Sequence, residues 1–252
     1  MKLGVADYGM LVWYGNHYDY DERIKTVREL GYDGLERLYP TSAEDALRKV
    51  ATLKKLGMSF ATCNSSNAEL AIKWTAALGG EYVWADVQGH TFDAYLRQLN
   101  EMAKVCNGYG IDVVVHNHLG TKAETQEQVE TILEKCPDVK LLFDVGHMAV
   151  AGGNVRHIMD TYYDRISAYH LKGWTVNKIT SEHELWFERG FFCGLEQGDF
   201  FIDNEYVFKE TVKRGFDGWV FIEQDTHLRD PKLDLAENIK VLKRWKKEVI
   251  GC

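Results

Sequence analysis

Imidazole and carboxylate side chains recur at the ends of apolar, strand-like stretches of this chain. The clearest of them are His116, Asp144, His170 and Glu223, which supply two imidazoles and two carboxylates from four separate stretches. Such groups are ligands for a divalent cation, and a set drawn from different strands leaves positions open for water or substrate. A single strand-end histidine is more often a hydrogen-bonded structural residue. Four such residues at one edge predict a metal site.

Strand-like and amphipathic helical stretches alternate along the whole chain and must position these residues. We predict eight strands, at residues 3–8, 33–38, 58–63, 81–87, 111–117, 139–145, 166–172 and 218–224. Several helical stretches run into a glycine that can close a helix in a left-handed conformation, namely Gly31, Gly57, Gly110 and Gly215. Repeated βα units predict an α/β protein with a parallel sheet. Eight units in 252 residues, with no Pro/Ser-rich linker, favour a single (β/α)8 TIM-barrel domain over residues 1–252.

One connection is much longer than the others, because residues 174–200 separate the seventh predicted strand from the next helix. This long loop after strand 7 contains several glycines and aromatic residues. Those residue types suit a hinged active-site lid. They equally suit a packed excursion that seals the top of the barrel.

Composition narrows the partners and the compartment. A net charge of −8 opposes a nucleic-acid partner. Five cysteines, odd in number and without CxxC spacing, argue against a disulfide framework and favour the reducing cytoplasm. No apolar run is long enough to cross a membrane. We therefore expect a cytoplasmic protein without a nucleic-acid or membrane partner. Composition does not fix the oligomeric state, and a homo-oligomer is possible.

Active sites of such barrels lie where strands end and βα loops begin. Strand side chains alternate between the two faces, so His116 and His118 share a face, as do His170 with Lys172 and Glu223 with Asp225. If the first residue of each pair points inward, the second does too. The predicted site therefore extends beyond the four candidate ligands.

Six pieces of the chain together resemble a known family. They are GYDGLE at 31–36, VVVHNHLGT at 113–121, LLFDVGHMAVAGG at 141–153, YHLKG at 169–173, GLEQGDF at 194–200 and GFDGWVFIEQD at 215–225. In this order they resemble the sugar phosphate isomerase/epimerase superfamily of xylose-isomerase-like barrels, and most of all its inosose dehydratases. The resemblance covers most of the chain.

The resemblance implies a metal held by the strand-five histidine or glutamate, the aspartate of DxGH, the histidine of HxK and the strand-eight glutamate. These positions are His116, Asp144, His170 and Glu223. The chain follows the HxH branch, and the choice between His116 and His118 as ligand stays open. The family's usual HLKD reads HLKG here, with Gly173 in place of the acid. The implied metal is Mn²⁺ foremost, with Co²⁺, Mg²⁺ or Zn²⁺ as alternatives.

The resemblance implies a small-molecule polyol or sugar substrate, and the reaction that it implies is dehydration of a cyclic polyhydroxy ketone, an inosose or a 3-keto sugar, through an enediolate. A divalent ion stabilises the developing oxyanion as a Lewis acid. A base and an acid must lie within reach of the transferred protons. The candidates are His118, His147 and Lys172, although His147 can instead orient a ligand and Lys172 can form a rim salt bridge.

Other residues are candidates for substrate binding. Glu36, at the end of the second predicted strand, either binds sugar hydroxyls or caps a loop. Trp13, Trp84 and Trp174 offer flat faces for a sugar ring, but tryptophans in barrels are more often core residues.

Three alternative functions follow from the same residues. The enediolate serves equally in a metal-dependent ketose 3-epimerase or a sugar isomerase. The rim can also belong to a non-catalytic sugar-binding barrel. An apurinic-site endonuclease is disfavoured, because Cys63 and Asp86 stand where its further zinc ligands are required.

Overall fold

The fold was analysed in a computed structural model that describes residues 1–15, 19–85, 87, 89–177, 185–223, 225 and 229–251. Eight strands form one sheet: β1 (Lys2–Ala6), β2 (Gly34–Leu38), β3 (Ser59–Cys63), β4 (Tyr82–Trp84), β5 (Asp112–His116), β6 (Val139–Asp144), β7 (Ile166–Leu171) and β10 (Trp219–Glu223). All seven pairings are parallel, in the order β3-β2-β1-β10-β7-β6-β5-β4.

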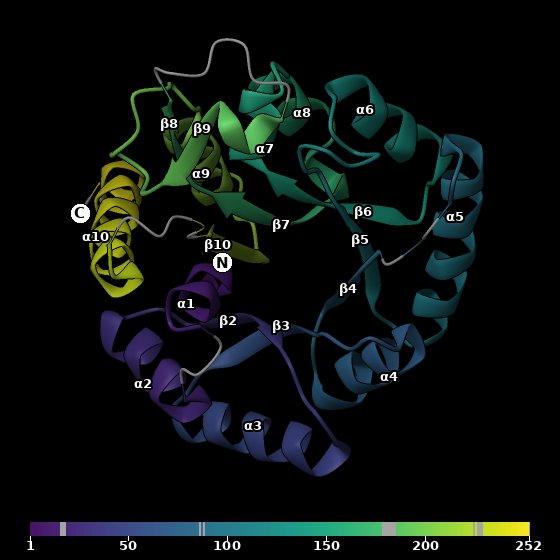
Figure 1. The fold of residues 1–252 in the computed structure, drawn as a ribbon, viewed down its shortest axis with the longest axis horizontal. Helices are drawn as coiled ribbons and strands as arrows, with labels where there is room; N and C mark the ends of the chain where they lie inside the picture. The colour runs from purple at the N-terminus through teal and green to yellow at the C-terminus, as the bar shows by residue number, and fades with distance from the viewer. Residues whose placement is uncertain are drawn as a thin grey trace.

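The two end strands of this order, β3 and β4, lie side by side, so the sheet curls into a nearly closed barrel. The Glu81 amide donates to the Ala61 carbonyl across this seam, at 2.7 Å. Helices surround the strands (Figure 1). They are α1 (Tyr8–Trp13), α2 (Tyr20–Leu30), α3 (Ala43–Lys55), α4 (Ala68–Leu78), α5 (Phe92–Gly108), α6 (Gln126–Lys135), α7 (Val145–Val150), α8 (Val155–Thr161), α9 (Asn204–Lys213) and α10 (Pro231–Ile250), with 3-10 turns at Tyr163–Arg165 (η1) and Trp186–Glu188 (η2). The predicted (β/α)8 barrel is confirmed.

The predicted strands are in the right places but generally too long by a residue or more at one or both ends. The first is wrong beyond Ala6, because α1 begins at Tyr8. Lys172 falls between two strands rather than inside one. Residue 224, predicted to end the last strand, and residue 86, in the fourth, lie outside the described residues. The four glycines expected to close helices, Gly31, Gly57, Gly110 and Gly215, all have positive φ.

Large aromatic rings from one strand fill the barrel interior beneath the site. Trp219 and Phe221 on β10 stack with their centroids 5.1 Å apart. They fit because the facing residues of β1 and β2 are glycines: a Cβ on Gly4 would lie 2.5 Å from the Phe221 ring, and one on Gly34 would lie 2.8 Å from Trp219. These packed rings form a rigid floor, and Phe221 also contacts His170, at 5.9 Å between centroids.

The long connection after β7 forms an antiparallel hairpin of β8 (Gly173–Val176) and β9 (Gly190–Cys193). Trp174 and Phe192 of this hairpin pack with Leu119 in a small buried cluster. In its described residues the connection is therefore a packed excursion over the barrel mouth. Residues 178–184, which belong to the predicted lid, lie outside the described part of the chain.

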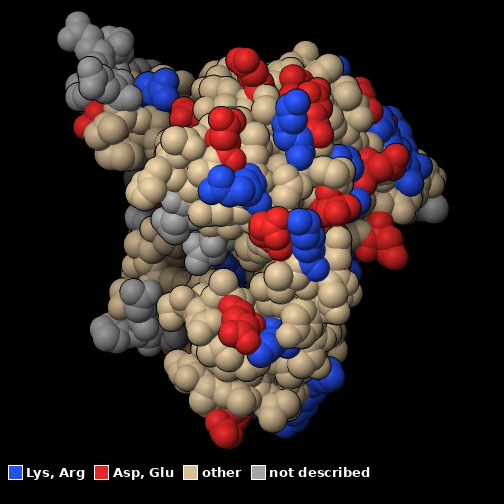
Figure 2. Space-filling model, turned by 90° about the vertical axis from the view of Figure 1, so that its right-hand side faces the viewer, with Lys and Arg blue, Asp and Glu red and all other residues tan. Residues whose placement is uncertain are grey.

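Two further features of the molecule are the distribution of charged side chains on its surface and the apolarity of its helices. On the face shown in Figure 2, basic and acidic side chains are interspersed. Within the described residues, none of the helices combines the length and the apolarity that a membrane span requires.

Candidate metal and substrate site

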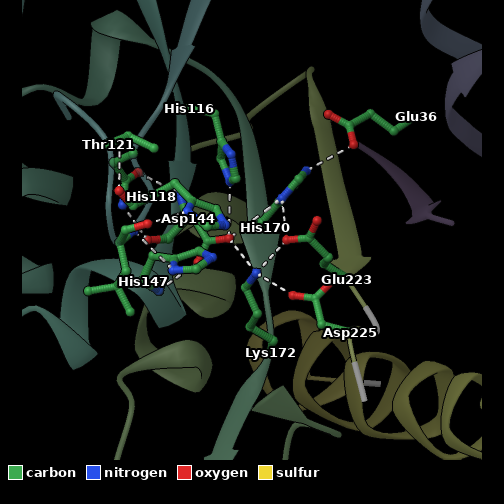
Figure 3. A network of polar contacts seen from close by, with 12 residues as sticks. Glu36, His116, His118, Thr121, Asp144, His147, His170, Lys172, Glu223 and Asp225 are labelled. Carbon is green, nitrogen blue, oxygen red and sulfur yellow. Dashed lines mark hydrogen bonds and ion pairs between the residues drawn. The ribbon is translucent and has the colours of Figure 1, made fainter. Parts of the chain in front are cut away.

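The four predicted metal ligands converge at the carboxyl ends of their strands. His116, Asp144 and Glu223 are the last residues of β5, β6 and β10, and His170 is next to last in β7. One ligand atom from each lies within 4.8 Å of the others (Figure 3). Parallel pairing causes this convergence, since Asp144 lies directly opposite His170 in the register of β6 and β7. His116 and Glu223, more than 100 residues apart in the sequence, thus lie close together.

Asp144 is held rigidly by its neighbours on both sides. Its backbone N–H and carbonyl each form a 2.8 Å hydrogen bond with the side-chain amide of Asn117. Its Oδ1 accepts the amide of His147 at 2.7 Å, which caps α7. Its Oδ2 faces His116 Nε2 at 3.2 Å. Burial acts to raise the pKa of this carboxyl, but Lys172 and the histidines outweigh it and hold the pKa well below its usual range.

His170 lies between two carboxylates. Its Nδ1 is 2.9 Å from Glu223 Oε2, and its Nε2 is 3.1 Å from Glu36 Oε2. The second pair is close enough for an ion pair, although it is not aligned as a hydrogen bond. Burial alone would lower the pKa of His170, but Glu223 and Glu36 raise it well above its usual range.

Glu36 is fully buried, and its contacts differ from the predicted binding of sugar hydroxyls. Its Oε1 accepts hydrogen bonds from Tyr82 Oη and Trp84 Nε1, both at 3.0 Å. Its Oε2 faces the far nitrogen of His170. A carboxylate in this position fixes the orientation and basicity of a metal-binding imidazole. The arrangement therefore suits a positioning residue, and direct contact of Glu36 with substrate stays a prediction.

Lys172 reaches the centre of the cluster from the peptide that follows β7. Its ammonium lies 2.9 Å from Asp144 Oδ2 and 3.1 Å from Asp225 Oδ2, and it also contacts Glu223 Oε2. Burial lowers its pKa, but these three carboxylates outweigh that effect and raise it. Lys172 is therefore a charged donor at the site. The sequence alone placed it only on the same strand face as His170.

His118 and His147 are both held by the backbone of Leu119. His118 Nδ1 lies 2.6 Å from the Leu119 carbonyl oxygen, which can only accept, so this nitrogen carries a proton. The Leu119 amide donates to His147 Nδ1 at 3.3 Å, so a neutral His147 carries its proton on Nε2. Burial, aided by neighbouring charges, lowers the pKa of both rings, far more for His147. In their neutral forms, Nε2 is thus an acceptor in His118 and a donor in His147.

The tryptophans at the site are not all those predicted. Trp174 is 3% exposed within the hairpin cluster, and its contact with substrate stays a prediction. Trp13 ends α1 and is 39% exposed, and its place in the site stays a prediction. Trp84 packs against His116 at 4.7 Å between centroids. Trp186, which we did not predict, lies 5.6 Å from both His118 and His147.

The family's missing acid at Gly173 has a steric explanation. Gly173 pairs with Cys193 in the hairpin, and a Cβ at position 173 would lie 2.3 Å from the Gly194 carbonyl oxygen. No side chain fits there. Asp225, two residues after the end of β10, is the third carboxylate around Lys172.

Two cavities open at this end of the barrel. The larger, of about 470 Å³, is lined by His116 and His118 together with Trp84 and Thr121. The smaller, of about 230 Å³, shares Trp84 and Ala85 with it and extends between β3 and β4 toward Arg37. His116, one of the four candidate ligands, therefore borders a space in which a small molecule fits.

A buried set of two carboxylates and two imidazoles beneath a small-molecule cavity, at the strand ends of a (β/α)8 barrel, defines a barrel with a candidate metal centre. The chain belongs to the xylose isomerase-like TIM barrel family, whose match spans residues 66–245.

Proteins with sequence similarity to the chain carry enzyme names. It is 32% identical over 142 residues to an inosose dehydratase of Bacillus licheniformis, which covers 53% of this chain and 47% of that protein. The chain thus aligns with about half the length of that relative. An inosose dehydratase of Clostridium botulinum is 25% identical over 277 aligned residues, with 92% of each chain covered.

The fold is also similar to solved structures. The probable 3-DHS dehydratase AsbF of Bacillus anthracis has a TM-score of 0.74, with 15% identity and coverage of 96% of this chain and 99% of that chain. At this identity the likeness concerns the fold alone.

Proposed function

We propose that this protein is a divalent-metal-dependent lyase that removes water from a cyclic polyhydroxy ketone, an inosose or a 3-keto sugar, through an enediolate. The observation that carries the proposal is the convergence of His116, Asp144, His170 and Glu223 within 4.8 Å of one another beside the larger cavity. The relatives named inosose dehydratase support this reaction class.

The donor set fits a divalent cation. Two ionised carboxylates point at one place from β6 and β10, and two imidazoles complete a mixed N/O set typical of such ions. When bound, a Mn²⁺ or similar ion supplies Lewis-acid stabilisation of charge developing on the ketone oxygen. Glu36 would keep His170 oriented toward this centre, as it does in the structure.

The histidines held by Leu119 divide the proton transfers between them. His118 presents an unprotonated Nε2 and lines the larger cavity, so it suits the base that takes the proton beside the ketone. His147 presents Nε2–H, which is buried and has no hydrogen-bond partner within the described residues, so it suits the donor to the departing hydroxyl. Lys172 is the charged donor that stabilises oxygen atoms of the substrate near Asp144 and Glu223.

The placement of the two rings favours elimination over epimerisation. Inversion at one carbon needs proton-transfer groups on both of its faces. His118 and His147 instead lie together, with centroids 3.7 Å apart. Groups side by side suit removal of a proton and protonation of a hydroxyl on neighbouring carbons. A ketose 3-epimerase or sugar isomerase remains the alternative enzyme, and a non-catalytic sugar-binding barrel is the alternative outside catalysis.

One assay series separates these functions. Inososes, ketoses and 3-keto glycosides are incubated with the purified protein, before and after chelation and with Mn²⁺ restored. We expect loss of water from a cyclic ketone that chelation abolishes and Mn²⁺ restores. Product NMR in deuterated water distinguishes elimination from exchange with inversion. Full activity after chelation would contradict the metal-dependent reaction, and bound metal without any turnover would favour the binding barrel.

A further inference from the structure

Arg37 is a largely buried arginine beside the candidate site, and its guanidinium donates no hydrogen bond to any residue that the structure describes. It lies on β2, and its side chain is 13% exposed. Its Nε is buried without a hydrogen-bond partner among the described residues. The nearest carboxylate oxygen, Glu36 Oε2, is 3.6 Å from Nε, which is too far for a hydrogen bond. The guanidinium otherwise stacks on Trp84, at 4.7 Å from the ring centroid.

The neighbouring acids do not provide hydrogen-bond acceptors for the Arg37 guanidinium. Glu36 already accepts from Tyr82 and Trp84 and faces His170. Two further buried acids act on the charge of Arg37, namely Glu223, which contacts His170 and Lys172, and Asp7, which pairs with Arg23 at 2.5 Å. These acids attract the cation, but none of them accepts a hydrogen bond from it within the described residues. An arginine carries five N–H donors in a planar fork, and those of Arg37 are available to another partner.

A partner for the Arg37 guanidinium can bind in the smaller cavity. Arg37 lines it together with Thr62 and Asn64, and the rest of the lining is largely apolar. The cavity lies at the seam between β3 and β4, where the barrel sheet is not continuous. Across Trp84 it adjoins the larger cavity with His116 and His118. A molecule whose ketone lies at those histidines can therefore extend past Trp84 to the guanidinium.

We propose that the substrate carries an oxyanion group, a carboxylate or a phosphate, which Arg37 binds in the smaller cavity. The inference rests on the proposed function for the ketone end of the substrate and narrows it at the other end: among cyclic polyhydroxy ketones, one that carries an oxyanion would be preferred to a neutral inosose. A planar guanidinium binds such groups through paired hydrogen bonds. A neutral polyol would leave the buried donors unpaired, and this penalty would discriminate against it.

Binding is tested first, because it needs no turnover. The probes are 4-oxocyclohexanecarboxylate, its carboxamide, which is the same shape without the charge, and 4-oxocyclohexyl phosphate. Calorimetry with the full chain, with and without Mn²⁺, should show the better anion binding about 10- to 100-fold more tightly than the carboxamide. Comparison of the two anions identifies which oxyanion the cavity prefers.

Three variants separate recognition from folding. Arg37→Gln should reduce binding of the anion to that of the carboxamide, and Arg37→Lys should keep part of the preference because it retains charge without the fork. Arg97→Gln replaces an exposed arginine of α5 and should leave every affinity unchanged. Circular dichroism checks that each variant is folded. The wild-type comparison of carboxylate, phosphate and carboxamide needs no variant at all.

The outcomes distinguish this inference from the proposed function. Equal affinity for anions and carboxamide, or a preference that survives Arg37→Gln in a folded protein, would overturn the inference. So would equally efficient water loss from an inosose and from a polyhydroxy oxocyclohexanecarboxylate. If anions bind through Arg37 but no ring loses water, the inference holds and the proposed lyase activity fails.

Discussion

The rings of His118 and His147 lie 3.7 Å apart between centroids, and both are held by Leu119, one through its carbonyl oxygen and the other through its N–H. The Leu119 carbonyl oxygen accepts from one ring, and its N–H donates to the other. Two neighbouring imidazoles thereby acquire different proton positions. Identical side chains can then perform opposite halves of one elimination.

This division predicts different defects in two variants. His118→Gln should abolish exchange of the proton beside the ketone in deuterated water, with a fall in kcat of about 10²- to 10⁴-fold. His147→Gln should retain exchange while water loss slows. NMR of the substrate measures exchange, and absorbance of the enone product measures elimination. His157→Gln, at a largely exposed histidine of α8, is the control. Loss of exchange in both variants alike would contradict the assignment.

Removal of either carboxylate ligand should remove the metal. Asp144→Asn and Glu223→Gln keep the size of the side chain but lose the charge that the ion requires. We expect elemental analysis to find little bound Mn²⁺ and turnover to be lost with it. Asp138→Asn, at an exposed acid before β6, should bind metal normally. Normal metal content in Asp144→Asn and Glu223→Gln would place the ion elsewhere.

Glu36 should act on the metal without touching it. Glu36→Gln keeps an oxygen that can accept from Tyr82 and Trp84 but removes the negative charge 3.1 Å from His170. The expected loss of metal affinity is about 10- to 100-fold, typical of a carboxylate behind a ligand. Titration with Mn²⁺ measures it. An unchanged affinity alongside a raised KM would instead favour the predicted contact of Glu36 with substrate.

Gly173, where the hairpin meets the site, leaves no room for a side chain. Gly173→Ala places a Cβ 2.3 Å from the Gly194 carbonyl oxygen, and we expect the free energy of unfolding to fall by about 1–3 kcal/mol. Gly108→Ala is the matched control, because nothing lies within 4 Å of its Cβ position at the end of α5. Chemical denaturation compares the two. Equal stability would mean that the hairpin is not packed as described.

Asp45, near the start of α3, should contribute pH-dependent stability. Partial burial acts to raise its pKa, but Lys49, at 2.7 Å, and the Thr41 amide, at 3.0 Å, outweigh it and lower the pKa to about 2. The contribution is therefore complete above the unfolded pKa near 3.8 and is lost as the pH falls through about 2. Asp45→Asn should cost about 1 kcal/mol at pH 7, after allowance for solvent screening, and less as the pH falls below 4. Denaturation at several pH values checks this, and a constant difference down to pH 2 would contradict it.

The regular order of strands and helices along the chain explains which features could be predicted from the sequence. The eight βα units predicted the barrel, and the positions of His116, His170 and Glu223 at the ends of predicted strands indicated that they meet at one edge of it. These regularities depend only on neighbouring residues and on the known closure of parallel sheets. They carry no information about how far one side chain reaches toward another.

Contacts made by loops and long side chains therefore escaped prediction. Trp186 reaches the two histidines through the fold of the hairpin, which no periodicity describes. The hydrogen bonds of Glu36 were not predicted, because Tyr82 and Trp84 lie more than 40 residues away in the sequence. Arg37 was overlooked because it neighbours Glu36 in a strand, and only the cavity reveals its unused donors.

The chain passes without a spacer from Lys172, whose ammonium sits among three acids, into Gly173, where the hairpin begins. Asn204 further anchors this junction, because its amide donates to the Lys172 carbonyl at 2.9 Å. Any displacement of the hairpin would pull on the lysine backbone and leave those acids without their counter-charge. The peptide bond between Lys172 and Gly173 thus links two features. A movement of the hairpin that opens the barrel mouth would also change the charge balance among the buried acids.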